Sequence, residues 1–200
     1  MSPLTSLAQA LGIAYAAGIN LYATIAILGL AERSGWITSL PGPLHAVDSL
    51  WIITLASLLY AVEFLATLVP GVASLWEAVH TAIRPPAAAL LAAGTVWGGE
   101  PRVMLAAALL GGGLALATHG TKLGLRVAVD TSPEPVTNGA VNLAELGVVT
   151  ALIVLMGRHP MLALALALLL LAMLLLLVRA VWRGLKSVFS RSREPMRSDA

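Results

Sequence analysis

Cysteine is absent from this chain of 200 residues, which excludes disulfides, thiolate metal sites and cysteine nucleophiles. Charge is also scarce, because only 11% of the residues are charged, against roughly 25% in a soluble domain. No Lys or Arg precedes Arg33, so the chain lacks the positive n-region of a secretory signal peptide. With 58% hydrophobic residues, these absences predict a polytopic membrane protein whose first apolar run is retained.

Apolar runs of about 20 residues, the length that crosses a bilayer, recur along the chain. They predict an all-α membrane helical bundle of about six transmembrane helices, forming a single domain over residues 1–185. A basic cytoplasmic tail, expected to be disordered, follows at 186–200. The predicted spans cover roughly residues 7–30, 50–69, 72–97, 103–129, 140–156 and 161–181.

Lys and Arg concentrate at the C-terminal end of the chain, which indicates its orientation. Cytoplasmic flanks of membrane helices carry an excess of these residues, so we expect this end to be cytoplasmic and to contact anionic lipid. An even number of spans then predicts that both termini are cytoplasmic. Because no basic module of domain size is present, we expect no nucleic-acid partner. The basic residues are Arg179, Arg183, Lys186, Arg191, Arg193 and Arg197.

Two interruptions fall inside predicted spans. Pro85 and Pro86 lie in the middle of the third span, where proline removes backbone donors and clashes with the preceding turn. This predicts a Pro-broken third helix, either one kinked span or a re-entrant hairpin of two shorter pieces. In the first span, Gly18 precedes the amide of Asn20, which either lines a path or bonds a neighbouring helix.

A weak internal echo links two of the spans. The segment SLWE at 74–77 matches NLAE at 142–145, and a proline-containing break precedes each of them. Small transporters are often built from repeated halves, although chance similarity between helices rich in Ala and Leu explains the echo equally well. Whether such halves run parallel or inverted stays open from the sequence.

Polar side chains recur at spacings of three or four inside several predicted spans, which places each set on one helix face. A charge in hydrocarbon costs at least a few kcal/mol, so it usually faces a partner or a water-filled cavity. A salt-bridge cluster that only fixes packing is the competing interpretation, and Lys122 and Arg126 could instead reach the headgroups. The candidate transport or binding residues are Asn20, Glu63, Glu77, His80, Arg84, His119, Lys122, Arg126, Asp130, Asn138, Asn142 and Glu145.

Three further expectations concern metals, catalysis and ion pairs. Glu77 and His80 have the Glu-x-x-His spacing of di-iron bundles, but the motif occurs once and Arg84 would repel a cation. No G-x-S-x-G motif is present, so we expect no metal, no cofactor and no catalytic residue. Arg84 is too deep to stay unpaired, and we expect Glu63 or Glu145 to neutralise it, Glu77 being a longer reach on the same helix.

Several motifs resemble one known family. GINLYAT at 18–24, SLWEAVHTAIRPPAAALLA at 74–92, and SPEPVTN at 132–138 followed by Glu145 are similar to a bacterial integral-membrane family described as domain of unknown function 4126. The resemblance covers about residues 7–156, and WEAVHTAIRPP is its most specific part. It implies a bacterial inner-membrane protein and supplies no reaction.

The function we expect is that of a small channel or transporter, moving an ion or a small polar solute through a charged cavity in the cytoplasmic half of the bundle. One alternative is a lipid-active protein, a flippase or headgroup enzyme, that holds phosphate with Arg84, Lys122 and Arg126. A structural or assembly subunit is the other alternative. The small size of the chain favours a homodimer.

Overall fold

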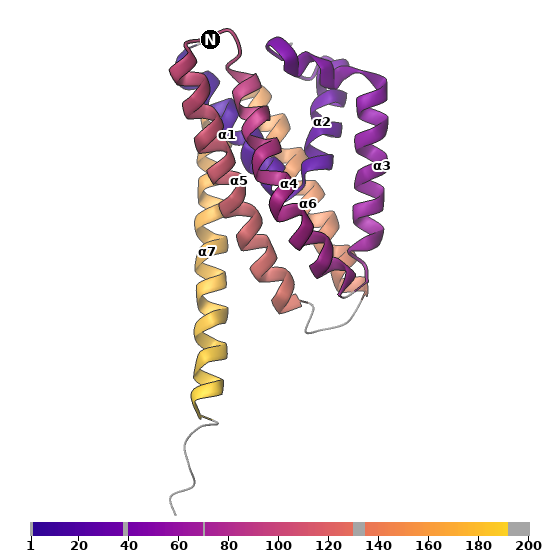
Figure 1. Cartoon of the computed structure of the whole chain (residues 1–200), viewed down its shortest axis with the longest axis vertical. Coiled ribbons are helices and arrows are strands. Elements are labelled where there is room, and N and C mark those ends of the chain that lie inside the picture. Colours follow the sequence, from indigo (N-terminus) through magenta and orange to yellow (C-terminus); the bar gives the residue numbers. More distant parts are fainter. Residues whose placement is uncertain (1, 38–39, 70, 130–134, 192–200) are drawn as a thin grey trace, which may run out of the picture.

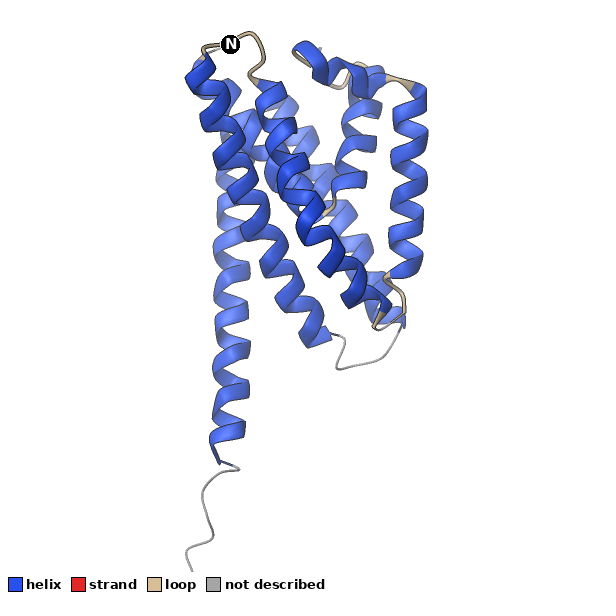
Figure 2. Cartoon of the chain, in the orientation of Figure 1, coloured by secondary structure: helices blue, strands red, loops and turns tan. Residues whose placement is uncertain are grey.

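Every regular element among the described residues, 2–37, 40–69, 71–129 and 135–191, is a helix (Figure 2). The chain, seen here in a computed structural model, is thus all-α, as its composition predicts. The helices are α1 (Pro3–Ile19), α2 (Leu21–Arg33), the short 3-10 helix η1 (Gly42–Asp48), α3 (Leu50–Ala66), α4 (Val72–Thr95), α5 (Pro101–Val129), α6 (Pro135–Arg158) and α7 (Pro160–Arg191).

Helices α3 to α7 run up and down the bundle in alternating directions (Figure 1), and they correspond to the last five predicted spans. By length and apolar composition, two of the described helical segments can cross a membrane unaided, Pro101–Leu125 and Val136–Arg158. A third qualifies if η1 and α3, which meet at 71°, form one broken span. Helix α4 has sufficient length but carries a stripe of charged residues. The chain is therefore a helical membrane protein.

The first predicted span is wrong, because α1 and α2 form a re-entrant hairpin (Figure 1). Pro3 at the start of α1 lines the same cavity as Ile37 and Leu40, which follow α2. Both outer ends of the hairpin therefore lie at one end of the bundle, and its tip lies inside. The start of α1 and the end of α7 consequently lie at opposite ends, which is incompatible with the expectation that both termini share one side.

Asn20 makes the break. Its backbone is extended (φ −149°, ψ 107°), and its N–H donates to the carbonyl of Ala16, which closes α1. Its side-chain oxygen accepts from the N–H of Ala23 at 2.9 Å and caps α2. A buried helix end needs such partners because no water is at hand to supply them. One asparagine therefore ends one helix and begins the next.

Close backbone packing holds the hairpin in the bundle centre. A Cβ added to Gly18 of α1 would lie 2.8 Å from the carbonyl oxygen of Ala115 on α5. A Cβ on Gly111 of α5 would lie 2.5 Å from the Cβ of Ala92 on α4. Small residues permit this approach, which is how membrane helices associate without a hydrophobic driving force.

The proline pair leaves α4 as one helix, which contains both Pro85 and Pro86. Of the two alternatives for this segment, the re-entrant hairpin is wrong. The backbone here is packed against α5, where a Cβ on Gly112 would lie 3.3 Å from the Pro85 carbonyl oxygen. Such packing against a neighbouring helix lets a membrane helix continue through proline. Helix α7 continues to Arg191, past the predicted start of the tail.

The hairpin makes a prediction about sidedness. Because the chain has no native cysteine, single cysteines placed at the exposed positions Ser2, Ser34 and Arg183 can be labelled without background. We expect an impermeant thiol reagent, applied to oriented membrane vesicles, to label Ser2→Cys and Ser34→Cys from one side and Arg183→Cys from the other. Labelling of Ser2→Cys on the Arg183→Cys side would instead restore a complete first span.

Candidate functional site

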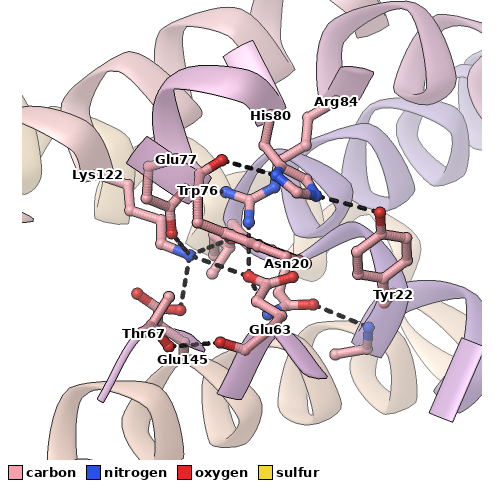
Figure 3. A network of polar contacts seen from close by, with 12 residues as sticks. Asn20, Tyr22, Glu63, Thr67, Trp76, Glu77, His80, Arg84, Lys122 and Glu145 are labelled. Carbon is pink, nitrogen blue, oxygen red and sulfur yellow. Dashed lines mark hydrogen bonds and ion pairs between the residues drawn. The ribbon is translucent and has the colours of Figure 1, made fainter. Parts of the chain in front are cut away.

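Charged side chains from α3, α4, α5 and α6 meet inside the bundle, beside the break between α1 and α2 (Figure 3). These residues are far apart in the sequence, and sequence reasoning assigned each of them to the candidate site. We call the set the buried charge cluster. It consists of Glu63, Glu77, Arg84, His119, Lys122 and Glu145.

Arg84 is fully buried and bridges two carboxylates. Its Nη2 lies 2.6 Å from Oε1 of Glu63 on α3, and its Nη1 lies 2.7 Å from Oε2 of Glu77. The pairing with Glu63 confirms that an acidic residue of another helix neutralises Arg84. Glu77 also reaches it from two turns away on the same helix, whereas Glu145 pairs elsewhere. Ion pairs made in low dielectric need such short, hydrogen-bonded geometry to offset desolvation.

Lys122 is the centre of the cluster. Its Nζ lies 2.9 Å from the main-chain oxygen of Ile19, 2.9 Å from Oε1 of Glu77 and 2.8 Å from Oε2 of Glu145. An ammonium group has three N–H donors; one donates to the Ile19 carbonyl, and the two carboxylate oxygens lie within ion-pair distance. Oε1 of Glu63 lies further away, at 3.8 Å. The alternative in which Lys122 extends to the headgroups is wrong, since its side chain is buried among these partners (Figure 3).

The cluster also holds the broken helix. Ile19 is the last residue of α1, and the C-terminal end of a helix carries a partial negative charge. Lys122 satisfies its carbonyl, while the side-chain amide of Asn20 donates to Oε1 of Glu63 at 2.9 Å. Asn20 therefore bonds a neighbouring helix, one of its two predicted roles.

Hydrogen-bond geometry makes His119 neutral. Arg84 Nη1 lies 2.8 Å from Nδ1 of His119, and because a guanidinium can only donate, Nδ1 must accept. The hydrogen then sits on Nε2, which donates to the main-chain oxygen of Glu77 at 3.1 Å. His119 thus adds hydrogen bonds to the cluster without adding charge.

His80 faces away from the charges. Its Nδ1 donates to the main-chain oxygen of Trp76 at 2.7 Å, and its Nε2 lies 3.1 Å from the hydroxyl of Tyr22 (Figure 3). Its ring stacks on Trp76 with 4.7 Å between centroids. Glu77 and His80 therefore do not converge, despite their Glu-x-x-His spacing. In the described part of the chain, no three His, Asp or Glu side chains gather as metal ligands.

The charges of the described cluster do not cancel. Glu63, Glu77 and Glu145 supply three carboxylates, while Arg84 and Lys122 supply two permanent cations. With His119 neutral, one negative charge is in excess when all the carboxylates of the cluster are ionised. A buried charge in excess is costly in a low-dielectric interior. The cluster is therefore set to take up one more positive charge.

Some buried polar atoms at the cluster also have no hydrogen-bond partner among the described residues. They include Oε2 of Glu63, Nε of Arg84, the hydroxyl of Tyr60 and Oε1 of Glu77, which forms an ion pair with Lys122 but no hydrogen bond. An unsatisfied buried polar group costs about 1–3 kcal/mol. The network is thus incomplete at the same place where it carries excess charge.

A polar strip continues from the cluster along α6. The side-chain amide of Asn142 donates to Oγ1 of Thr67 at 2.8 Å, directly after α3, and Asn138 is buried one turn earlier.

The side chain of Arg126 and the whole of Asp130 lie outside the described residues. Sequence reasoning missed Tyr22, Thr67 and the Ile19 carbonyl. Only Tyr22 carried a signal, as a tyrosine beside Asn20 in an apolar run.

The two halves of the internal echo meet at Lys122, since Glu77 and Glu145 both bind it. Helices α4 and α6 run in the same direction (Figure 1), so the echoing segments are parallel in space.

A cavity of about 510 Å³ opens at the end of the bundle where α1 begins. None of the cluster side chains lines this cavity. The cluster itself is closely packed.

Comparison with known proteins gives one match. A family model described as "Domain of unknown function (DUF4126)" matches residues 7–180, a range that contains the whole buried charge cluster. No curated protein and no solved structure matches the chain.

The pairing of Arg84 generates a stability prediction. Arg84→Met leaves Glu63 and Glu77 without their shared cation, and breaking a buried ion pair costs about 3–5 kcal/mol. Arg102 is a matched control, because its side chain is 93% exposed while that of Arg84 is 0% exposed, and we expect Arg102→Met to cost at most about 1 kcal/mol. Unfolding of the purified protein in detergent measures both.

Adding Glu63→Gln to Arg84→Met should recover part of the lost stability, since it removes one uncompensated charge. Equal stability of Arg84→Met and Arg102→Met would show that the guanidinium is not held as described.

Proposed function

The chain belongs to the domain of unknown function 4126 family, and from the buried charge cluster we propose that it moves one positive charge, a proton or a small monovalent cation, across a membrane. The observation that carries this proposal is the excess of three carboxylates over two permanent cations among the described residues of the bundle interior. A site of this charge attracts a single positive charge. Ionisable groups inside membrane proteins commonly mark such ion and proton pathways.

The break at Asn20 supports transport as well. Ion sites in many secondary transporters lie at discontinuous helices, where unwound backbone and helix ends contact the ion. Here the end of α1, the start of α2 and the cluster lie together. A hairpin that ends within the bundle can shift without moving a complete span.

A purely structural role is the main competitor. Polar networks that only fix packing are expected to be fully satisfied, because a partly satisfied network is less stable than an apolar core. This cluster has excess charge, and Oε2 of Glu63 has no partner among the described residues. Small residues already bring α1, α4 and α5 into close contact, so packing does not require the charges.

A lipid-headgroup function is less well supported. Phosphate would have to displace the carboxylates that occupy Arg84 and Lys122, and it would add negative charge to a cluster that already has an excess of negative charge.

We propose that the end of α7 lies on the cytoplasmic side of a bacterial inner membrane, because its flank is basic. The start of α1 would then lie on the far side.

Glu145 offers the sharpest test. Glu145→Gln leaves two carboxylates against two cations, so the cluster becomes neutral. We expect this variant to be as stable as the original protein or more stable, because the excess buried charge is removed. We also expect proton or cation flux into reconstituted vesicles to fall about tenfold or more, since the charge that attracts the ion is gone.

Glu100→Gln is the matched control, because this side chain is exposed at the bundle end and its only described partner is Arg102 at 3.7 Å. Its flux should equal that of the original protein. A pH-sensitive dye and a cation-sensitive dye inside the vesicles separate the two cargoes. If Glu145→Gln lowers stability and leaves flux unchanged, the cluster is structural.

A further inference from the structure

We propose that the proton or cation reaches the buried charge cluster between α3 and α6, from the end of the bundle where α3 meets α4. We call this contact the α3–α6 seam, formed by Glu63 and Thr67 on one side and Asn142 and Glu145 on the other. The inference rests on the proposed function and adds a route to it.

The exposure of the carboxylates points to this seam. The side chain of Glu145 is 14% exposed, whereas those of Glu63 and Glu77 are 3% and 0% exposed. Within the described part of the chain, Glu145 also has one cationic partner, Lys122, while Glu77 has two. The cluster therefore meets its surroundings at Glu145, the carboxylate that is held least tightly.

A ladder of polar groups leads from Glu145 to the bundle end. Asn142 lies three residues before it and Asn138 four residues before that, so one face of α6 carries a polar group on each turn, about 5.4 Å apart. Thr67 follows the last residue of α3 and faces Asn142. Gly139 lies against Leu68, where a Cβ would be 3.6 Å away. The ladder thus ends near the first turn of α6, at the end from which α7 projects (Figure 1).

The seam is held by polar contacts. The side-chain amide of Asn142 donates to Oγ1 of Thr67 at 2.8 Å and lies 3.4 Å from the main-chain oxygen of Phe64. Water or an ion can replace such hydrogen bonds at little net cost. On the α1 side of the cluster, Gly18 packs against Ala115, where no added Cβ fits. Of these two sides, the seam is the one that hydration can open.

The chemistry of the seam suits a small cation or a proton carried by water. Hydroxyl, amide and carboxylate oxygens are the ligands that hard cations prefer. Tyr60 lies three residues before Glu63 on α3, and neither its hydroxyl nor Oε2 of Glu63 has a partner among the described residues. Both groups are placed to bind an arriving ion or its water.

Lys122 can change its carboxylate partner when a proton or cation binds Glu145. A proton or cation that binds Glu145 removes one of the three close partners of Nζ. Oε1 of Glu63, 3.8 Å away, is within reach as a replacement. The ammonium can therefore move from Glu145 toward Glu63 while it still holds the carbonyl of Ile19.

Cysteine labelling tests the route without measuring flux. Asn142→Cys on the ladder is compared with Leu143→Cys, its neighbour, whose side chain is exposed on the outer surface of the bundle. A thiolate, which forms only in water, attacks a small charged methanethiosulfonate and releases methanesulfinate, so we expect Asn142→Cys to react about tenfold faster in vesicles. The reagent should work from the same side that labels Arg183→Cys. Equal, slow reaction of both cysteines would overturn the route.

A reversible clamp tests whether the route is used. Thr67→Cys and Asn142→Cys are combined and joined by a short bis-methanethiosulfonate, whose two disulfide links a reductant cleaves, because the native side chains are within hydrogen-bond distance. We expect joining to abolish the flux that the unjoined double variant shows and cleavage of the joint to restore it, while the same treatment of Leu143→Cys, whose side chain lies outside the seam, leaves flux unchanged. Full joining with unchanged flux would overturn the inference.

The outcomes for the two proposals are separable. Loss of flux in Glu145→Gln together with full flux in the joined protein would keep the proposed function and reject the seam. If the original protein moves neither protons nor monovalent cations, the proposed function fails, and the inference fails with it whatever the labelling shows.

Discussion

The ammonium group of Lys122 links the re-entrant hairpin of α1 and α2 to the carboxylates of the buried charge cluster. It closes the carbonyl end of α1 at Ile19, pairs with Glu77 on α4 and pairs with Glu145 on α6. A helix that ends inside a bundle leaves backbone groups that water cannot reach, and each costs free energy unless it finds a partner. The charged side chains satisfy that need, so the re-entrant hairpin and the buried charge cluster depend on one another.

The cluster resists two simple explanations. A fully satisfied salt-bridge network would balance its charges, yet in the described cluster three carboxylates face two permanent cations. A phosphate site would leave donors free, yet Lys122 has a close oxygen for each of its N–H groups. The explanation that we favour is a cluster that is stabilised when it binds one positive charge. This is a physical basis for exchange, because a proton or cation and the ammonium compete for the same carboxylates.

The packing differs between two sides of the buried charge cluster. This difference indicates the side from which a proton or cation would enter in the proposed function. On the α1 side, glycine and alanine bring backbones together so closely that no added Cβ fits at Gly18. On the α3 side, an amide and a hydroxyl make the contact between Asn142 and Thr67. Close-packed apolar seams exclude water, whereas polar seams can exchange their hydrogen bonds with it.

The sequence by itself determined the helices and most of the cluster. Apolar runs predicted α3 to α7, and helical spacing placed Glu77 and Arg84 on one face. The cost of an unpaired buried charge was enough to predict that Glu63 or Glu145 neutralises Arg84, and the structure shows Glu63 in that role. These conclusions rest on local periodicity and on a single energetic rule, and both can be read from the chain.

Only the tertiary structure decided where the chain breaks. The proline pair was the strongest local signal, yet α4 continues through Pro85, whereas the chain turns back at Asn20. Asparagine inside a helix costs less than about 1 kcal/mol, so nothing near Asn20 distinguishes a span from a hairpin. The deciding partner of the break is Lys122, 103 residues beyond Ile19 in the chain. A contact of that separation has no local signature, because it exists only once the helices have packed.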